Sequence, residues 1–201
     1  MHSVRILVLF LLAVFFSAHA SAGENPPLRV ARVPIIVLPG CHMGAGDLEA
    51  LERRLGYAVH VPLNGVLHSV EYLPPSDCRA ALDEIMSQLR KTNRKARLMD
   101  AMEPLSERLD ADLVICPVVE RYFQYASMGM SWREETLWYS NARISLMGYE
   151  RKTGRPFCET ESRFYRGDSS AWGRVEVLAG ECLDKVIERT GIWSMVHPPA
   201  K

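Results

Sequence analysis

The sequence predicts a single mixed α/β domain. Three long extended runs follow one another over residues 112–126, 136–150 and 156–166, and amphipathic helical patterns stand before and after them. A Val- and Ile-rich run near residue 30 adds a further buried strand. Strands and helices in this order pack as layers around one core. We therefore expect a mixed sheet with an antiparallel hairpin region towards the C-terminus and helices packed on it.

The first elements are a strand and a helix. Val30 to Leu38 is rich in branched apolar residues and ends at a Pro-Gly pair, which favours a buried strand followed by a turn. Asp47 can cap the next helix, whose Leu residues recur on one face until Gly56 ends the pattern. A hairpin over residues 57–72 is then expected, because it contains Asn64-Gly65, the dipeptide favoured in two-residue turns.

Two helices fill the middle of the chain. Pro74 to Asp77 ends the extended region and supplies a cap, and apolar residues from Cys78 to Leu89 then repeat at the three-four spacing of a buried helix face. A second helical pattern runs from Leu98 to Leu109. Pro104 must kink or restart this helix, because a proline inside a helix removes a hydrogen bond.

The long strands and a last helix complete the domain. The link over residues 151–155 is short and contains a glycine, which favours an antiparallel hairpin. The closing helix is capped between Asp168 and Ser170 and ends at Gly191. In the middle strand, the residues expected on the covered face are Trp138, Ala142, Ile144 and Leu146. The residues expected on the buried face of the closing helix are Trp172, Val175, Leu178, Cys182 and Val186.

The N-terminus has the plan of a secretory signal peptide. Arg5 is its only charged residue, the apolar run Ile6 to Phe16 is shorter than the roughly 20 residues that cross a bilayer, and two overlapping A-x-A motifs end at Ala20 and Ala22. Leu38 to Cys41 has the form of a lipid-attachment motif but follows a predicted core strand, so we expect export without a lipid anchor. The expected segments are a signal peptide (1–22), a flexible lead (23–29), one domain (30–191) and a C-terminal tail (192–201).

Charge and cysteine usage exclude some classes of function. The chain has 24 basic and 24 acidic residues; residues 1–22 hold one base and no acid, so 23 and 24 remain without them, a net charge of −1. A neutral chain argues against a broad surface for nucleic acid or anionic membrane. Five cysteines stand at long, irregular spacings, which favours buried thiols, with room for one disulfide, over a zinc site.

No catalytic motif stands out. Cys41 with His42 is the nearest approach to a nucleophile and base, although adjacent side chains usually point apart. The three residues His42, His60 and His68, together with Cys41 or Cys78, could form a metal site. The acids that could supply acid and base groups are Glu134, Glu135, Asp168, Asp112 and Glu120. None of these sets has the spacing of a known motif, so we expect no catalytic residue, no metal and no cofactor.

Aromatic residues cluster on two predicted strands and their link. Exposed Trp and Tyr side chains are favoured anchors of protein interfaces, and Met128 and Met130 on the link add flexible apolar side chains. The alternative is that the aromatic residues are cross-strand pairs and core. The cluster consists of Tyr122, Phe123, Tyr125, Trp132, Trp138 and Tyr139. Of these, the expected binding residues are Tyr122, Tyr125, Trp132, Trp138 and Tyr139.

Three segments resemble a pattern of bacterial envelope proteins. They are the entry strand Arg32 to Pro39, the Asp-Ala-Asp-Leu-Val strand Asp110 to Val114, and the hairpin turn Lys152 to Arg155 before a final helix. In the order of elements, residues 30–190 resemble the periplasmic domain of curli-secretion-channel-like lipoproteins and the N-terminal domain of TolB. The chain departs from them at Cys116-Pro117, where those proteins tend to have Gly, and it lacks their lipid-anchored N-terminus. The resemblance implies an envelope accessory or assembly domain that binds proteins and has no enzyme activity.

These patterns predict a periplasmic or extracellular, non-enzymatic binding or assembly protein of the cell envelope. Its expected partners are envelope proteins and not nucleic acid. The alternative is an exported hydrolase that uses a Cys/His site or a pair of carboxylates.

Overall fold

The computed structural model of the chain describes residues 27–60, 70–127 and 136–196. The expected signal peptide lies outside these ranges, and the helices inside them are all too short or too polar to cross a membrane. In chain order the elements are β1 (Leu28–Arg32), β2 (Ile36–Val37), α2 (Ala45–Val59), β3 (Val70–Tyr72), α3 (Pro75–Thr92), η1 (Leu98–Ala101), α4 (Met102–Leu109), β4 (Leu113–Ser127), β5 (Leu137–Glu150), β6 (Arg155–Gly167), η2 (Ala171–Gly173), α5 (Val175–Thr190) and α6 (Ile192–Val196).

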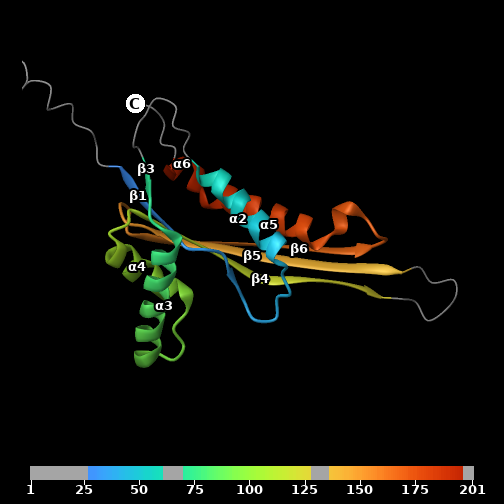
Figure 1. Cartoon of the computed structure of the whole chain (residues 1–201), viewed down its shortest axis with the longest axis horizontal. Coiled ribbons are helices and arrows are strands. Elements are labelled where there is room, and N and C mark those ends of the chain that lie inside the picture. Colours follow the sequence, from blue (N-terminus) through green and yellow to red (C-terminus); the bar gives the residue numbers. More distant parts are fainter. Residues whose placement is uncertain (1–26, 61–69, 128–135, 197–201) are drawn as a thin grey trace, which may run out of the picture.

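One mixed six-stranded sheet forms the centre of the fold (Figure 1). The strand order is β3-β1-β4-β5-β6, and β2 pairs with β4 beyond the end of β1. β1 and β2 run parallel to β4, whereas β4, β5 and β6 form an antiparallel meander. The β5–β6 turn contains Gly154, whose φ of 63° suits a residue without a Cβ. The predicted mixed sheet, with its antiparallel hairpin and packed helices, is confirmed.

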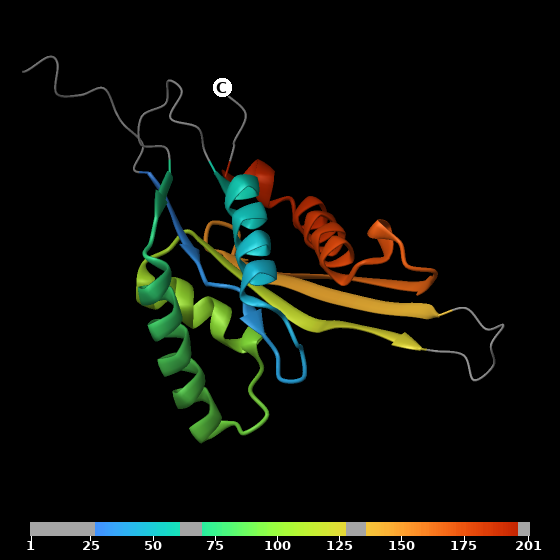
Figure 2. The same ribbon diagram turned by 45° about the vertical axis from the view of Figure 1, so that its right-hand side comes forward.

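Helices cover the two faces of the sheet unequally. α2, α5 and α6 pack on one face, where Leu55, Ile144 and Leu183 are buried in one core cluster. α3 and α4 pack on the other face, where Leu82 and Leu105 belong to a second cluster. In Figure 1 and Figure 2 the outer part of β4 and β5 extends well beyond α3 and α4. Among the described elements, only α3 and α4 cover the second face, and they cover it at the end of the sheet near β1 and the β5–β6 turn, which we call the inner end.

The first strand is interrupted. The strand expected over Val30 to Leu38 forms two short strands, β1 and β2, and β1 begins at Leu28. Pro34 lies between them, and a proline has no N–H to contribute to a sheet ladder. Both pieces still pair in parallel with β4, so β4 keeps a neighbouring strand on this side on both sides of the interruption.

The hairpin expected over residues 57–72 is wrong in its first arm. α2 continues to Val59, because Val59 falls four residues after Leu55 on the same buried face and Gly56 does not interrupt that spacing. The second arm is β3, which pairs in parallel with β1 instead. The Asn64-Gly65 dipeptide lies outside the described residues.

The helix ends differ in part from expectation. Gly44 precedes α2, and Asp47 lies inside its first turn instead of capping it. Trp172 is not on the buried face of the closing helix: it lies in η2 and is 77% exposed. The other expected residues of that face, from Val175 to Val186, are buried in α5. Pro104 restarts the helix as expected, since it lies in the first turn of α4, where a missing N–H costs no intrahelical bond.

Candidate binding surface

A β-bulge in β4 decides which of its aromatic residues face the core. Up to the bulge, the residues of β4 that belong to the core cluster under α2 and α5 are the odd-numbered Leu113, Ile115 and Val119. The register against β5 shifts between Val119 and Arg121, and Glu120 is the extra residue. Because side chains alternate along a strand, one extra residue exchanges the two faces beyond it. Tyr122 consequently belongs to the core cluster, and Phe123 lies on the opposite, uncovered face.

Beyond the bulge, side chains of three strands form a row on the uncovered face. Tyr125 of β4, Tyr139 of β5 and Arg166 of β6 are direct neighbours in the register. The rings of Tyr125 and Tyr139 are stacked, with centroids 5.1 Å apart and planes inclined by 8°. Cζ of Arg166 lies 5.5 Å from the centroid of the Tyr139 ring, where a cation is attracted to the π electrons. The three side chains therefore form one continuous stack.

A second row adjoins this stack on its inner side. Phe123, Asn141 and Phe164 are opposite one another in the register. The Phe123 ring centroid lies 6.1 Å from that of Tyr125, and Phe164 lies 6.5 Å from Tyr139. Phe164 is 61% exposed and Tyr125 53% exposed, although both lie inside strands. We call Phe123, Tyr125, Tyr139, Phe164 and Arg166 the open aromatic face.

Polar contacts fix the bulge beside the open aromatic face. Glu120 accepts a hydrogen bond of 2.6 Å from Nε of Arg143 and another from Oγ of Ser145. Oγ of Ser145 also lies 2.7 Å from Oγ1 of Thr160. The bulge residue is thus held by β5 directly and by β6 through Ser145, which keeps the exchanged faces in place.

The structure brings together two of the five predicted binding residues. Tyr125 and Tyr139 are the stacked pair of the open aromatic face. Tyr122 is only 4% exposed. Trp138 is half-buried on the opposite face, beside a pocket of about 330 Å³ near the start of α5. Trp132 lies outside the described residues.

Tyr122 has the surroundings of a core residue. Its buried hydroxyl lies near the carboxylate of Asp47 without a hydrogen bond of regular geometry. Burial first, and then the Asp47 carboxylate, raise the pKa of Tyr122 far above its usual range. Tyr122 is therefore a core residue and not part of the candidate surface.

Three residues of the open aromatic face are missing from the predicted binding residues: Phe123, which belongs only to the wider aromatic cluster, and Phe164 and Arg166, which belong to neither set. The signal that locates Phe164 and Arg166 is the short hairpin link. Counting outward from the pair Glu150 and Arg155 that closes this hairpin places Arg166 opposite Tyr139. The same count places Phe164 one row further in, on the same face.

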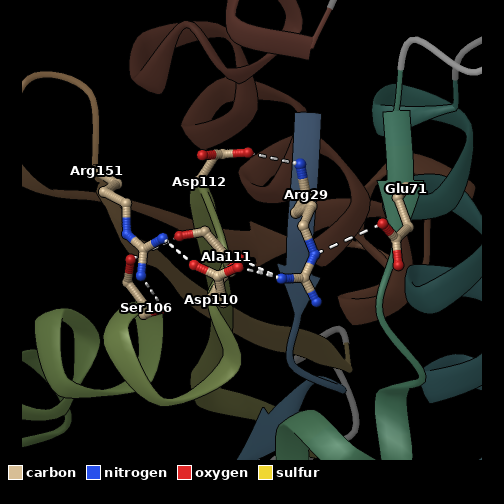
Figure 3. Close-up of polar contacts among 7 residues, drawn as sticks. All are labelled: Arg29, Glu71, Ser106, Asp110, Ala111, Asp112 and Arg151. Carbon is tan, nitrogen blue, oxygen red and sulfur yellow. Dashed lines mark hydrogen bonds and ion pairs between the residues drawn. The ribbon is translucent and has the colours of Figure 1, made fainter. Parts of the chain in front are cut away.

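The Asp-Ala-Asp motif is part of a polar cluster at the inner end of the sheet (Figure 3). Asp110, in the left-handed conformation with φ 48°, accepts hydrogen bonds of 2.6 Å from Arg29 and 2.5 Å from Arg151. Arg151 also donates to the carbonyl of Ser106 at 3.1 Å, and Asp112 accepts from the backbone N–H of Arg29 at 2.9 Å. The cluster joins β1, α4, the start of β4 and the β5–β6 turn. Asp110 and Asp112 therefore have a structural role, which is to hold these elements together.

We expect Asp110→Asn to lower the free energy of unfolding at neutral pH while preserving the left-handed conformation, which Asn tolerates. The hydrogen bond and charge of Arg151, followed by Arg29, hold the pKa of Asp110 below its usual range. The ionised carboxylate therefore stabilises the fold above its unfolded-state pKa of about 3.9, and this stability is lost as pH falls through the lower folded-state pKa. Urea unfolding of both proteins from neutral to strongly acidic pH should show their difference shrink; a pH-independent difference would contradict this linkage.

The Cys41/His42 site of the alternative hydrolase has ordinary structural surroundings. Sγ of Cys41 donates to the carbonyl of Val119 at 3.7 Å, and burial raises the pKa of this thiol, which disfavours the reactive thiolate. His42 and His60 are exposed, and His68 lies outside the described residues. Within the described ranges, no three His, Cys, Asp or Glu residues are placed to hold a metal ion.

We expect the exposed Cys158 to be the first thiol labelled in the native protein, although burial raises the pKa of this thiol as well. The five cysteines are free, and Cys158 on β6 is exposed, Cys41 is partly buried, and Cys78, Cys116 and Cys182 are buried. Burial also raises the pKa of Cys116 to about 12. Mass spectrometry after brief thiol labelling should find the probe on Cys158, and Cys158→Ser should remove that first label. Labelling of Cys116 at the same rate would contradict the packed second cluster.

Comparisons with known proteins give similar structures but no family. No family model and no curated protein match the chain. The hypothetical protein CT253 from Chlamydia trachomatis is similar with 10% identity, covering 85% of this chain and 98% of that one at a TM-score of 0.43. A PelC dodecamer from Paraburkholderia phytofirmans has 14% identity, 84% and 91% coverage and a TM-score of 0.39. Lipoprotein GNA1162 from Neisseria meningitidis has 15% identity, 82% and 99% coverage and a TM-score of 0.35.

None of these three proteins is named as an enzyme, and one of them, GNA1162, is named as a lipoprotein. At these identities and TM-scores the likeness carries no conclusion about what this chain binds or does. The resemblance to TolB and to the curli-type lipoproteins stays a prediction.

Proposed function

We propose that the chain is an exported, non-enzymatic binding protein of the cell envelope that holds a protein partner on its open aromatic face. The observation that carries the proposal is the stack of Tyr125, Tyr139 and Arg166, in which Tyr125 and Arg166 are exposed and Tyr139 is half-buried, on strands whose opposite face is packed against α5. Aromatic and Arg side chains are enriched at the centres of protein interfaces, where they bury large areas. Stacked rings are already ordered, so little side-chain entropy is lost when a partner covers them.

The charges around the open aromatic face indicate what the partner offers. The charge of Arg143 is offset by Glu120, whose carboxylate lies 2.6 Å away. Among the described residues, no acidic side chain forms an ion pair with Arg121 or Arg166, which both lie on this face. The surface is therefore apolar with a positive rim, and it suits a partner segment that combines apolar side chains with acids.

Quantitative affinity purification from an envelope fraction tests the proposal. The wild type is compared with Tyr125→Ala/Tyr139→Ala and with Tyr57→Ala, a matched control that removes a 73% exposed ring from α2. Proteins retained by the wild type and the control should be depleted at least about tenfold by the double variant, because a tenfold loss corresponds to about 1.4 kcal/mol and one hot-spot aromatic residue contributes about 2 kcal/mol or more. A partner list that is empty, or that the double variant leaves unchanged, would contradict the proposal.

A further inference from the structure

Among the described residues, β6 has a strand partner on one side only, and on its backbone the carbonyl of Thr160 accepts a hydrogen bond of 3.5 Å from Arg189. β6 is the last strand of the sheet, it is 13 residues long, and its described pairing is with β5 alone. Its Phe157 and Tyr165 side chains pack under α5, so the helix covers a face of the strand. An edge strand displays unpaired N–H and C=O groups that can pair with a strand of another chain.

The charges of β6 favour one way in which two copies of this edge can pair. When two identical strands pair antiparallel about a two-fold axis, a residue that lies a given number of positions before the axis faces the residue of the other copy that lies the same number of positions after it. With Ser162 on the axis, Glu161 of each copy faces Arg163 of the other. An axis through Glu161 or through Arg163 would instead place identical charges opposite each other, which is destabilising. The attractive charge pattern therefore favours Ser162.

The remaining pairs of this register are compatible. Thr160 would face Phe164, and Glu159 would face Tyr165, so no like charges are opposed.

Arg163 in a single chain is incompletely bonded. Its Nε is buried without a hydrogen-bond partner, although it lies 3.3 Å from Glu161 and 4.0 Å from Glu181. Glu161 in turn is shared with Arg189 at 2.8 Å. A second Glu161, brought across the axis from another copy, would supply the Arg163 guanidinium with a further carboxylate.

We propose that two copies of the chain join their β6 strands in antiparallel pairing about Ser162. The two meanders then form one continuous sheet, and the two-fold axis, which is perpendicular to that sheet, leaves both open aromatic faces on the same side. Such a dimer presents two binding surfaces to one partner assembly, which raises apparent affinity without any new contact. The dimer does not depend on the proposed function, because it uses the edge of β6 and not the face.

Mass measurement and position-specific crosslinking test this dimer. Sedimentation equilibrium of the exported chain should give twice the monomer mass. In a Cys158→Ser background, Ser162→Cys brings two thiols face to face, with Cβ atoms roughly 5.5 Å apart. Arg155→Cys, an exposed position on the same strand, places its two copies 14 register positions apart, roughly 48 Å. A short bifunctional thiol reagent should therefore link the first variant and leave the second unlinked.

Two outcomes would overturn the dimer. One is a monomeric mass for the exported chain. The other is a larger mass in which position 162 fails to crosslink, or crosslinks no better than position 155. Both substituted side chains are at exposed sites, and urea unfolding checks that each variant is folded. Tyr125→Ala/Tyr139→Ala should remain dimeric, so failure of the partner proposal and failure of the dimer give different results.

Discussion

Replacing Tyr122 by alanine is expected to lower the free energy of unfolding by about 3–5 kcal/mol, whereas the same change at Tyr125 should cost about 1 kcal/mol or less. The two residues are three positions apart on β4. Tyr122 fills the core cluster under α2 and α5, and its loss leaves a cavity. Tyr125 is 53% exposed and loses chiefly its stacking with Tyr139. The contrast follows from the bulge at Glu120.

Urea unfolding of the two alanine variants measures this contrast. Tyr122→Phe is the matched control, because it keeps the ring and removes only a buried hydroxyl that lacks a regular hydrogen bond. We expect it to stay within about 1 kcal/mol of the wild type. Similar losses for Tyr122→Ala and Tyr125→Ala would mean that the bulge does not separate core from surface.

Gly148→Ala is expected to destabilise the protein by roughly 3 kcal/mol. Gly148 lies in β5 opposite Phe157, and an added Cβ would collide with the backbone carbonyl of Val114 and with the Phe157 ring. A ring can turn aside, but a carbonyl in the neighbouring strand cannot move without disturbing the β4–β5 ladder. The variant should therefore lose stability in the centre of the sheet.

Gly46→Ala is the matched control for this change. Gly46 lies in α2, and a Cβ there meets nothing within 4 Å. Alanine in a helix should stabilise the protein by about 0.5–1 kcal/mol. Thermal unfolding of both variants should give shifts of opposite sign, and an unchanged melting temperature for Gly148→Ala would contradict the close approach of β4 and β5.

Periodicity predicted the long strands and helices because their patterns extend over many residues. It failed where a pattern was short. Val59 continues the buried face of α2, but its β-branched side chain fits a strand equally well. Pro34 splits the entry strand into β1 and β2 because it cannot donate to the ladder of hydrogen bonds. The apolar run continues on both sides of Pro34, so hydrophobicity alone does not mark this boundary.

The candidate surface could be predicted only in part, for a similar reason. The segment from Leu113 to Val119 is buried on both faces, so its sequence does not tell which side of β4 faces which helices. Glu120 is neither Gly nor Pro, and nothing in its residue type marks the bulge. The faces of Tyr122 and Tyr125 are therefore assigned only by the register with β5. Phe164 and Arg166 join them through the register of β6, far away in the sequence.

Site-specific photo-crosslinking in cells tests the binding surface most directly. A photoreactive amino acid replaces Tyr125 or Tyr139 in the open aromatic face, or Tyr57 on α2 as an exposed position elsewhere on the protein. We expect positions 125 and 139 to give adducts with the same envelope protein, identified by mass spectrometry, and position 57 to give none with it. No adduct from positions 125 and 139, or an equal adduct from all three positions, would contradict a partner bound on the open aromatic face.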